Sequence, residues 1–173
     1  MYLFKNLLKA NSTIITDEEN KEFKIIKKIA KRRNLKMTTI GNNLRGIKII
    51  HNKYEANNQI VKIVFNSKIY QLKIPLIGFF QIKNLFMAIL AALNCGLNQN
   101  RIFNQLHKIK PVPGRLECVA SLNNHSNIVV DFAHTPDALE QSLIALKKQF
   151  KSEIIIVFWC GGEIDKKKKV CYG

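Results

Sequence analysis

Asp131 and His134 are the residues of this sequence whose types and spacing best suit chemistry. They follow the apolar run 128–130 and precede the pair Thr135-Pro136. The apolar run predicts a buried strand, and the Thr-Pro pair predicts the start of a helix. In open α/β sheets, ligands bind at the carboxyl ends of strands and beside helix N-termini. The two side chains could therefore hold ribose or phosphate oxygens, or position a metal-bound nucleotide.

A structural role explains the same two residues equally well. Asp131 would then accept hydrogen bonds from nearby backbone N–H groups, and His134 would lie in the loop between the strand and the helix. Spacing alone leaves the two interpretations balanced.

Arg115 follows the turn-forming pair Pro113-Gly114 and is a second candidate. A guanidinium presented by a tight turn matches the oxygens of a phosphate or carboxylate. A salt bridge with Glu117 explains the same arginine without a ligand. Gly161-Gly162 follows a later apolar run, as a phosphate loop might, but it also suits a flexible turn. The chain contains no G-x-x-x-x-G-K-[ST] sequence, which excludes the common nucleotide-binding loop from these residues.

Hydrophobic periodicity predicts the elements that would position these residues. After residue 111 we expect three strands, at 116–122, 127–133 and 153–159, and one helix at 136–150. The helix and the two strands on either side of it would form a right-handed β-α-β unit. Before residue 111 we expect strands at 12–15, 35–40 and 46–52, and a hairpin of 59–65 with 68–75 that turns at Asn66-Ser67. Helices are expected from the acidic segment 16–19 to about residue 33, over 84–95 and over 101–109.

The segment Pro111-Val-Pro113-Gly114 is the best candidate for a domain boundary. We therefore expect one unit over residues 1–110 and a second over 111–173. Alternating strands and helices indicate the α/β class.

Composition indicates an ordinary globular protein, because 47% of the 173 residues are hydrophobic and 23% are charged. The N-terminus lacks the apolar run of a signal peptide, and the longest apolar stretch is too short to span a membrane. We expect a cytosolic location and no membrane partner. The four cysteines form no CxxC pair, so buried thiols explain them better than zinc or disulfides do.

The formal net charge of +16 raises the possibility of a nucleic-acid partner. Of the 28 basic residues, 23 are lysines, and they are scattered among many Ile and Asn residues. An AT-rich coding sequence would produce the same mixture. The basic cluster at 27–33 also suits a solvated helix terminus, so composition explains the charge better than a nucleic-acid site does.

Four segments, in order along the chain, resemble the Mur ligases of peptidoglycan synthesis. They are Gly78–Asn84 with the alanine-rich run after it, Pro113–Glu117, Val130–Ala138 and Val157–Lys168. The third is the most specific, and a weaker match runs from Phe4 to Asp17, so the resemblance covers essentially the whole chain. It is nearest to the branch that adds the third peptide residue, diaminopimelate or lysine.

The resemblance implies the end of a central ATP-binding domain over 1–110 and the first hairpin and β-α-β unit of a Rossmann-like C-terminal domain over 111–173. In this family ATP phosphorylates a substrate carboxylate, usually with Mg²⁺, and an amino acid's amine then forms an amide. The implied partners are UDP-N-acetylmuramoyl-L-alanyl-D-glutamate and the amino acid. By resemblance, three residues bind ATP: Asn84 at the base or ribose, Arg115 at the γ-phosphate and Asp131 at the ribose. The resemblance implies that Arg115, Asp131 and the neighbouring His134 are catalytic. It also implies that Asp165 and Lys168 bind substrate.

The family's phosphate loop, carbamylated lysine and Mg²⁺ ligands would lie upstream of Met1, so no metal ligand is expected within these residues. We expect a partial ligase that is inactive and poorly soluble alone. The alternative is one subunit of a split ligase, complemented by a chain that carries the phosphate loop; a basic nucleic-acid-binding module is a remote third. Ile164 stands where the family has an arginine that pairs with the acceptor carboxylate, and an isoleucine cannot donate such a bond.

Overall fold

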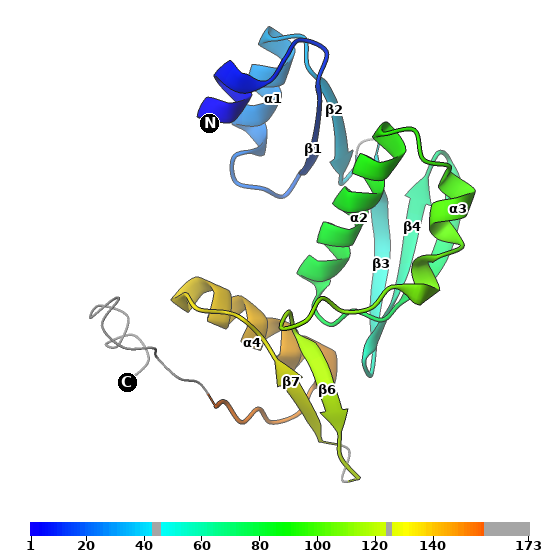
Figure 1. The fold of residues 1–173 in the computed structure, drawn as a ribbon, viewed down its shortest axis with the longest axis vertical. Coiled ribbons are helices and arrows are strands. Elements are labelled where there is room, and N and C mark those ends of the chain that lie inside the picture. Colours follow the sequence, from blue (N-terminus) through cyan, green and yellow to red (C-terminus); the bar gives the residue numbers. More distant parts are fainter. Residues whose placement is uncertain (43–45, 124–125, 158–173) are drawn as a thin grey trace. The chain divides into compact units, whose positions relative to one another are not determined.

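The computed structural model describes residues 1–42, 46–123 and 126–157. The chain divides into two compact units, and each unit is built from three separate segments of the chain. The first unit holds Met1–Lys53, Ile60–Ile74 and Phe80–Ile109, and the second holds Tyr54–Gln59, Pro75–Phe79 and the described residues after Ile109. Strands and helices are both present in the described residues, and β1, α1 and β2 alternate along the chain (Figure 1), which confirms the α/β class.

A parallel strand pair with a crossover helix begins the first unit. Its elements are β1 (Thr13–Asp17), α1 (Phe23–Arg32) and β2 (Lys36–Ile40), after a π-helical turn at Leu3–Leu7. Alternate residues of β1 are buried, and Ile14 packs with Ile26, Ala30 and Leu35 of the crossover. Arg33 fixes the N-terminal turn by donating to the carbonyl oxygens of Phe4 and Leu8 at 2.9 and 2.6 Å.

A three-stranded sheet of order β3-β4-β5 follows (Figure 1). Its strands are β3 (Lys48–Glu55), β4 (Asn58–Phe65) and β5 (Lys68–Ile74), and the helical elements after it are α2 (Phe79–Asn94), α3 (Gln99–Phe103) and a 3₁₀ turn at Leu106–Lys108. Phe86 and Ile82 of α2 are fully buried, as are Val61 and Ile63 of β4. The predicted turn Asn66-Ser67 is confirmed, since both residues have positive φ (49° and 59°), as a type I′ turn requires.

The second unit carries an antiparallel hairpin and a helix. The hairpin is β6 (Glu117–Ser121) with β7 (Asn127–Val130), in which Glu117 lies opposite Val130, and the helix is α4 (Pro136–Phe150). Its core is Ile77, Leu116 and Ala145, and Cys118 and Val129 pack against that core from one face of the hairpin. Gln149 of α4 donates to the carbonyl oxygens of Ala56 and Asn58 at 2.6 and 2.9 Å, which ties the β3–β4 turn to this unit.

Several predicted elements differ from the structure. The strand predicted at 127–133 ends at Val130, and the strand predicted at 46–52 is Lys48–Glu55. α1 begins at Phe23, not after the acidic segment, and α2 begins at Phe79, five residues before the predicted start. The predicted helix 101–109 is two short pieces, because α3 ends before Asn104. Residues 153–157 form no strand, and Ile155 and Val157 are 93% and 94% exposed, so no neighbouring strand pairs with them.

Among the described helices, none combines the length and the apolar character that crossing a membrane demands.

Candidate functional site

Arg115 lies in a tight turn that leads into β6. Gly114 has φ of +66°, and the Arg115 N–H donates to the carbonyl oxygen of Val112 at 3.0 Å. Glu117 fastens the turn from the other side, because its carboxylate accepts from the Gly114 N–H at 2.8 Å. The turn thus places an exposed arginine at the start of the hairpin.

Asp131 is tied to both neighbouring elements. One carboxylate oxygen accepts from the Leu116 N–H at 3.2 Å, and the other accepts from the hydroxyl of buried Ser142 in α4. These bonds show a structural role for Asp131, as one of the two sequence interpretations proposed. The carboxylate can still accept further hydrogen bonds, since each oxygen has a second lone pair available to a ligand hydroxyl.

Phe132 joins Arg115 to His134. The Arg115 guanidinium carbon lies 5.7 Å from the centre of the Phe132 ring. The centres of the Phe132 and His134 rings are 5.5 Å apart, and the two ring planes are tilted relative to each other. The backbone holds the group together, because the Phe132 N–H donates to the carbonyl oxygen of Gly114 at 2.8 Å. His134 Nδ1 lies 3.1 Å from the Phe132 carbonyl oxygen.

Sequence reasoning did not single out Phe132, which is 66% exposed. The available signal was an aromatic residue placed directly after an acidic one at a strand end. A guanidinium over such a ring gains a cation–π attraction and is held in a narrower range of positions. The arrangement can therefore present a positive charge and an imidazole side by side to an anionic ligand.

The N-terminus of α4 lies directly after this group. The Thr135 hydroxyl caps the helix by accepting from the Ala138 N–H at 3.2 Å, and Pro136 occupies the first turn, as the sequence predicts. The helix keeps the partial positive charge of its end, which adds to the preference of this region for anions.

The remaining predicted site residues lie elsewhere. Asn84 is an exposed residue of α2 and belongs to the first unit, whereas Arg115, Asp131 and His134 belong to the second. Of the predicted site residues that the structure describes, these three share one unit and Asn84 does not. Asp165 and Lys168, like Gly161-Gly162, lie outside the described residues.

Lys83 is a partly buried cation that sequence reasoning missed. Its ammonium lies 2.7 Å from an Asp17 carboxylate oxygen and 2.5 Å from one of Glu19, so α2 is bonded to the carboxyl end of β1. Burial lowers the pKa of Lys83, but the hydrogen bonds and charges of Asp17 and Glu19 outweigh it and raise the pKa above its ordinary value.

No cluster of three or more His, Cys, Asp or Glu side chains suited to a metal ion occurs within the part of the chain that the structure describes. Exposed Arg115 suits an anionic group, and the remaining lone pairs of Asp131 suit a hydroxyl donor.

Two family models match the sequence. One, described as the Mur ligase middle domain, matches residues 1–92, and the other, described as the Mur ligase, glutamate ligase domain, matches residues 114–173. Together they match residues in both units.

Individual proteins give the same result. The UDP-N-acetylmuramoyl-L-alanyl-D-glutamate–2,6-diaminopimelate ligase of Rickettsia montanensis is 34% identical over 99% of this chain and 35% of its own length. A solved structure of a ligase with the same name has a TM-score of 0.65 and 25% identity over 92% of this chain and 33% of its own. Folylpolyglutamate synthetase from Lactobacillus casei, at 21% identity and TM-score 0.66 over 86% of this chain and 38% of its own, shares the fold. The chain spans about a third of the length of the curated relatives that it matches.

Proposed function

Because this chain belongs to the Mur ligase family, we propose that it contributes part of the ATP site of a ligase that joins diaminopimelate to UDP-N-acetylmuramoyl-L-alanyl-D-glutamate. The substrates are proposed from the names of its relatives. The role is a step of peptidoglycan synthesis, and we propose a cytoplasmic location, where sugar nucleotides and ATP are found.

The observation that carries this proposal is the arrangement of Arg115, Phe132 and His134 beside Asp131. When bound, ATP supplies the phosphoryl group that activates the substrate carboxylate. Arg115 would neutralise phosphoryl oxygens through its fork of N–H donors. Asp131 would accept from a ribose hydroxyl while remaining bonded to Leu116 and Ser142.

The other assignments are part of the same proposal. His134 would lie beside the phosphates, and Asn84 would contact the base or ribose. Asp165 and Lys168 would bind the amino-acid or peptide substrate. Mg²⁺ would accompany ATP, with ligands from other parts of the ligase, since the described residues offer no cluster for it.

A chimeric ligase tests the proposal. This chain would replace the matching third of the Rickettsia montanensis enzyme, and ADP release would be measured with the sugar-nucleotide dipeptide, ATP, Mg²⁺ and diaminopimelate. We expect release that depends on diaminopimelate, and a fall in kcat of about 10²–10³-fold in Arg115→Ala, because one charge-stabilising donor is lost. Arg101→Ala is the control, because Arg101 is an exposed arginine of α3. If Arg115→Ala turned over as fast as that control, the assignment would be wrong.

We propose further that this chain is a partial ligase that is inactive alone. The alternative is that it is one subunit of a split ligase, complemented by a polypeptide that supplies the phosphate loop. The observation that favours a complementing partner is the outer face of the hairpin, where Val119, Ile128 and Val130 are about half exposed (52%, 47% and 45%). Exposed apolar side chains that lie together on one face often mark a site of contact with another protein.

Co-expression tests the split-ligase form. The Rickettsia montanensis ligase without its matching third would be co-expressed with this chain, tagged, and the pair purified on the tag. We expect co-purification and restored ADP release, and we expect Val119→Lys with Ile128→Lys to abolish both. Activity of this chain alone would refute the need for a partner.

A further inference from the structure

The first unit contains a basic trough beside α1 and β2 that the ligase role does not use. Its volume is about 1120 Å³, above the roughly 300–1,000 Å³ of most small-ligand pockets. Five lysines line it, four from α1 and one from β2: Lys24, Lys27, Lys28, Lys31 and Lys36. None of the described residues that line it is acidic.

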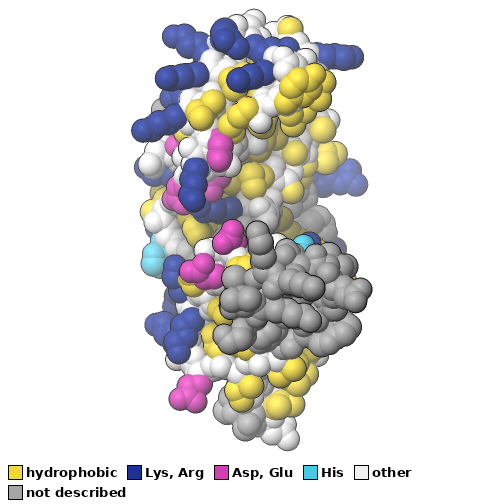
Figure 2. Space-filling view, turned by 90° about the vertical axis from the view of Figure 1, so that its left-hand side faces the viewer, with side chains coloured by type: hydrophobic (Ala, Val, Ile, Leu, Met, Phe, Trp, Pro, Cys, Tyr) yellow, Lys and Arg dark blue, Asp and Glu magenta, His cyan; other side chains and the backbone are white. Residues whose placement is uncertain are grey.

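The lysines of α1 form one stripe. Their spacing of three and four residues places them on one side of the helix, while Ile26, Ile29 and Ala30 face the core. Figure 2 shows lysine and arginine side chains crowded over the α1 part of the first unit. Like charges at this spacing repel and destabilise a helix, and a bound polyanion would remove that repulsion.

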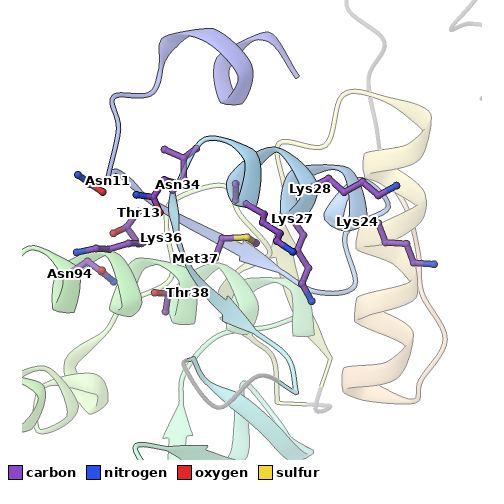
Figure 3. Close-up of a pocket in the computed structure, with 13 residues that line it drawn as sticks. Asn11, Thr13, Lys24, Lys27, Lys28, Asn34, Lys36, Met37, Thr38 and Asn94 are labelled. Atoms are coloured by element: carbon purple, nitrogen blue, oxygen red, sulfur yellow. The ribbon is translucent and has the colours of Figure 1, made fainter.

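The charges do not converge on one point. In Figure 3, Lys24, Lys27 and Lys28 extend from α1, whereas Lys36 lies with Asn11, Thr13 and Asn94 at the opposite end. Met37 lies between the two ends. Such an elongated arrangement suits a chain of regularly spaced negative groups and does not suit a single phosphate ion.

We propose that this trough binds the phosphodiester backbone of a single-stranded nucleic acid. The lysines would neutralise phosphates, and the amide and hydroxyl groups of Asn11, Asn34 and Thr13 would donate to phosphate and sugar oxygens. The described lining contains no aromatic side chain on which a base could stack, so the proposed contacts are to phosphate and sugar, which carry no base-sequence information.

A membrane surface fits these observations less well. Helices that bind membranes insert an apolar face beneath the headgroups, but the apolar face of α1 is buried against β1, where Ile26 and Ala30 pack on Ile14. The proposal goes beyond the ligase role, and its failure would leave that role unaffected.

Fluorescence anisotropy with the full chain and a labelled oligouridylate of about 15 nucleotides tests the proposal. Five phosphate contacts predict a slope of log affinity against log salt of about −3.5, which is a loss of about a hundredfold between 50 and 200 mM salt. Changing all five trough lysines to glutamine should remove most of this slope and weaken binding at least tenfold in low salt.

The matched control removes the same charge from exposed lysines outside the trough: Lys48, Lys53, Lys62, Lys68 and Lys148, each changed to glutamine. It should bind nearly as well as the parent. Equal losses in the two variants would overturn the proposal, because they would show that the overall charge attracts RNA. Absence of oligouridylate binding, equal competition by polyglutamate of matched length, or equal binding to phosphatidylserine vesicles would overturn it as well.

Circular dichroism melting checks that the five-lysine variant folds. If it does not, Lys24→Gln with Lys28→Gln replaces it, since both residues are exposed. The slope should then fall by about 1.4, the share of two phosphate contacts, and an unchanged slope would overturn the proposal.

Discussion

Asp131→Ala would remove the one acceptor that the Leu116 N–H and the Ser142 hydroxyl share. Leu116 is fully buried and Ser142 is 6% exposed, so water replaces the lost acceptor poorly at either donor. A buried donor without an acceptor costs about 1–3 kcal/mol. We therefore expect the free energy of unfolding of the second unit to fall by about 3 kcal/mol.

Ser142→Ala gives the comparison, because it removes a donor and leaves the half-buried carboxylate able to bind water. We expect a loss of about 1 kcal/mol. The double variant should lose less than the sum of the two single losses, since the serine hydroxyl can no longer be left unpaired. This coupling energy distinguishes the bonded pair from two independent side chains.

Urea unfolding followed by circular dichroism measures the global loss, and hydrogen exchange at the Leu116 amide measures the local one. The amide should exchange faster in Asp131→Ala than in Ser142→Ala. The reasoning is refuted if Asp131→Ala costs no more than Ser142→Ala, or if the Leu116 amide exchanges at the parental rate in both.

Three further predictions concern the first unit. The raised folded pKa of Lys83 means that its ion pairs stabilise the fold fully below its ordinary pKa of 10.5 and lose this contribution as pH rises through the higher folded value; alkaline urea titrations should show the decline in the parent and not in Lys83→Gln. Ser67→Gly should stabilise the β4–β5 hairpin by about 0.5 kcal/mol, because glycine adopts positive φ at lower cost, and a lower melting temperature would contradict this. Phe86→Ala should destabilise by about 3–5 kcal/mol through the cavity left in the core, whereas Phe80→Ala at a 39% exposed position should cost far less in the same urea assay.

The elements that the sequence predicts well are those whose ends are set by neighbouring residues. α4 runs from Pro136 to Phe150 as predicted, because Thr135 caps it, proline suits its first turn, and Lys151 ends it in the left-handed conformation. The Asn66-Ser67 turn is equally local. These signals lie within a few residues of the boundary that they determine.

The elements that the sequence predicts poorly depend on distant partners. The acidic residues after β1 resemble a helix start, but Glu18 instead accepts from the Thr39 hydroxyl at 2.7 Å and from the Asn42 N–H at 2.8 Å. Their neighbours Asp17 and Glu19 bind Lys83 in the first turns of α2, which begins before the predicted residue. Periodicity contains no information about such pairs.

The candidate site divides in the same way. Its position at the end of β7 followed from the sequence pattern, and Arg115, Asp131 and His134 do lie in one unit. The bonds of Asp131 to Leu116 and Ser142 could not be predicted, because they join residues 15 and 11 positions away through tertiary folding.

The hydrogen bonds from Gln149 to the β3–β4 turn can form only late in synthesis. The turn leaves the ribosome about 90 residues before the helix that binds it, given separations of 93 and 91 positions. The carbonyl groups of Ala56 and Asn58 in the nascent chain are therefore hydrated until α4 emerges. Closing so long a loop slows folding. A chain started at Pro111 would also lack both this turn and the core residue Ile77. The second unit thus completes its folding late. Because it is built from separate segments, it cannot be exchanged between proteins as one contiguous stretch of sequence.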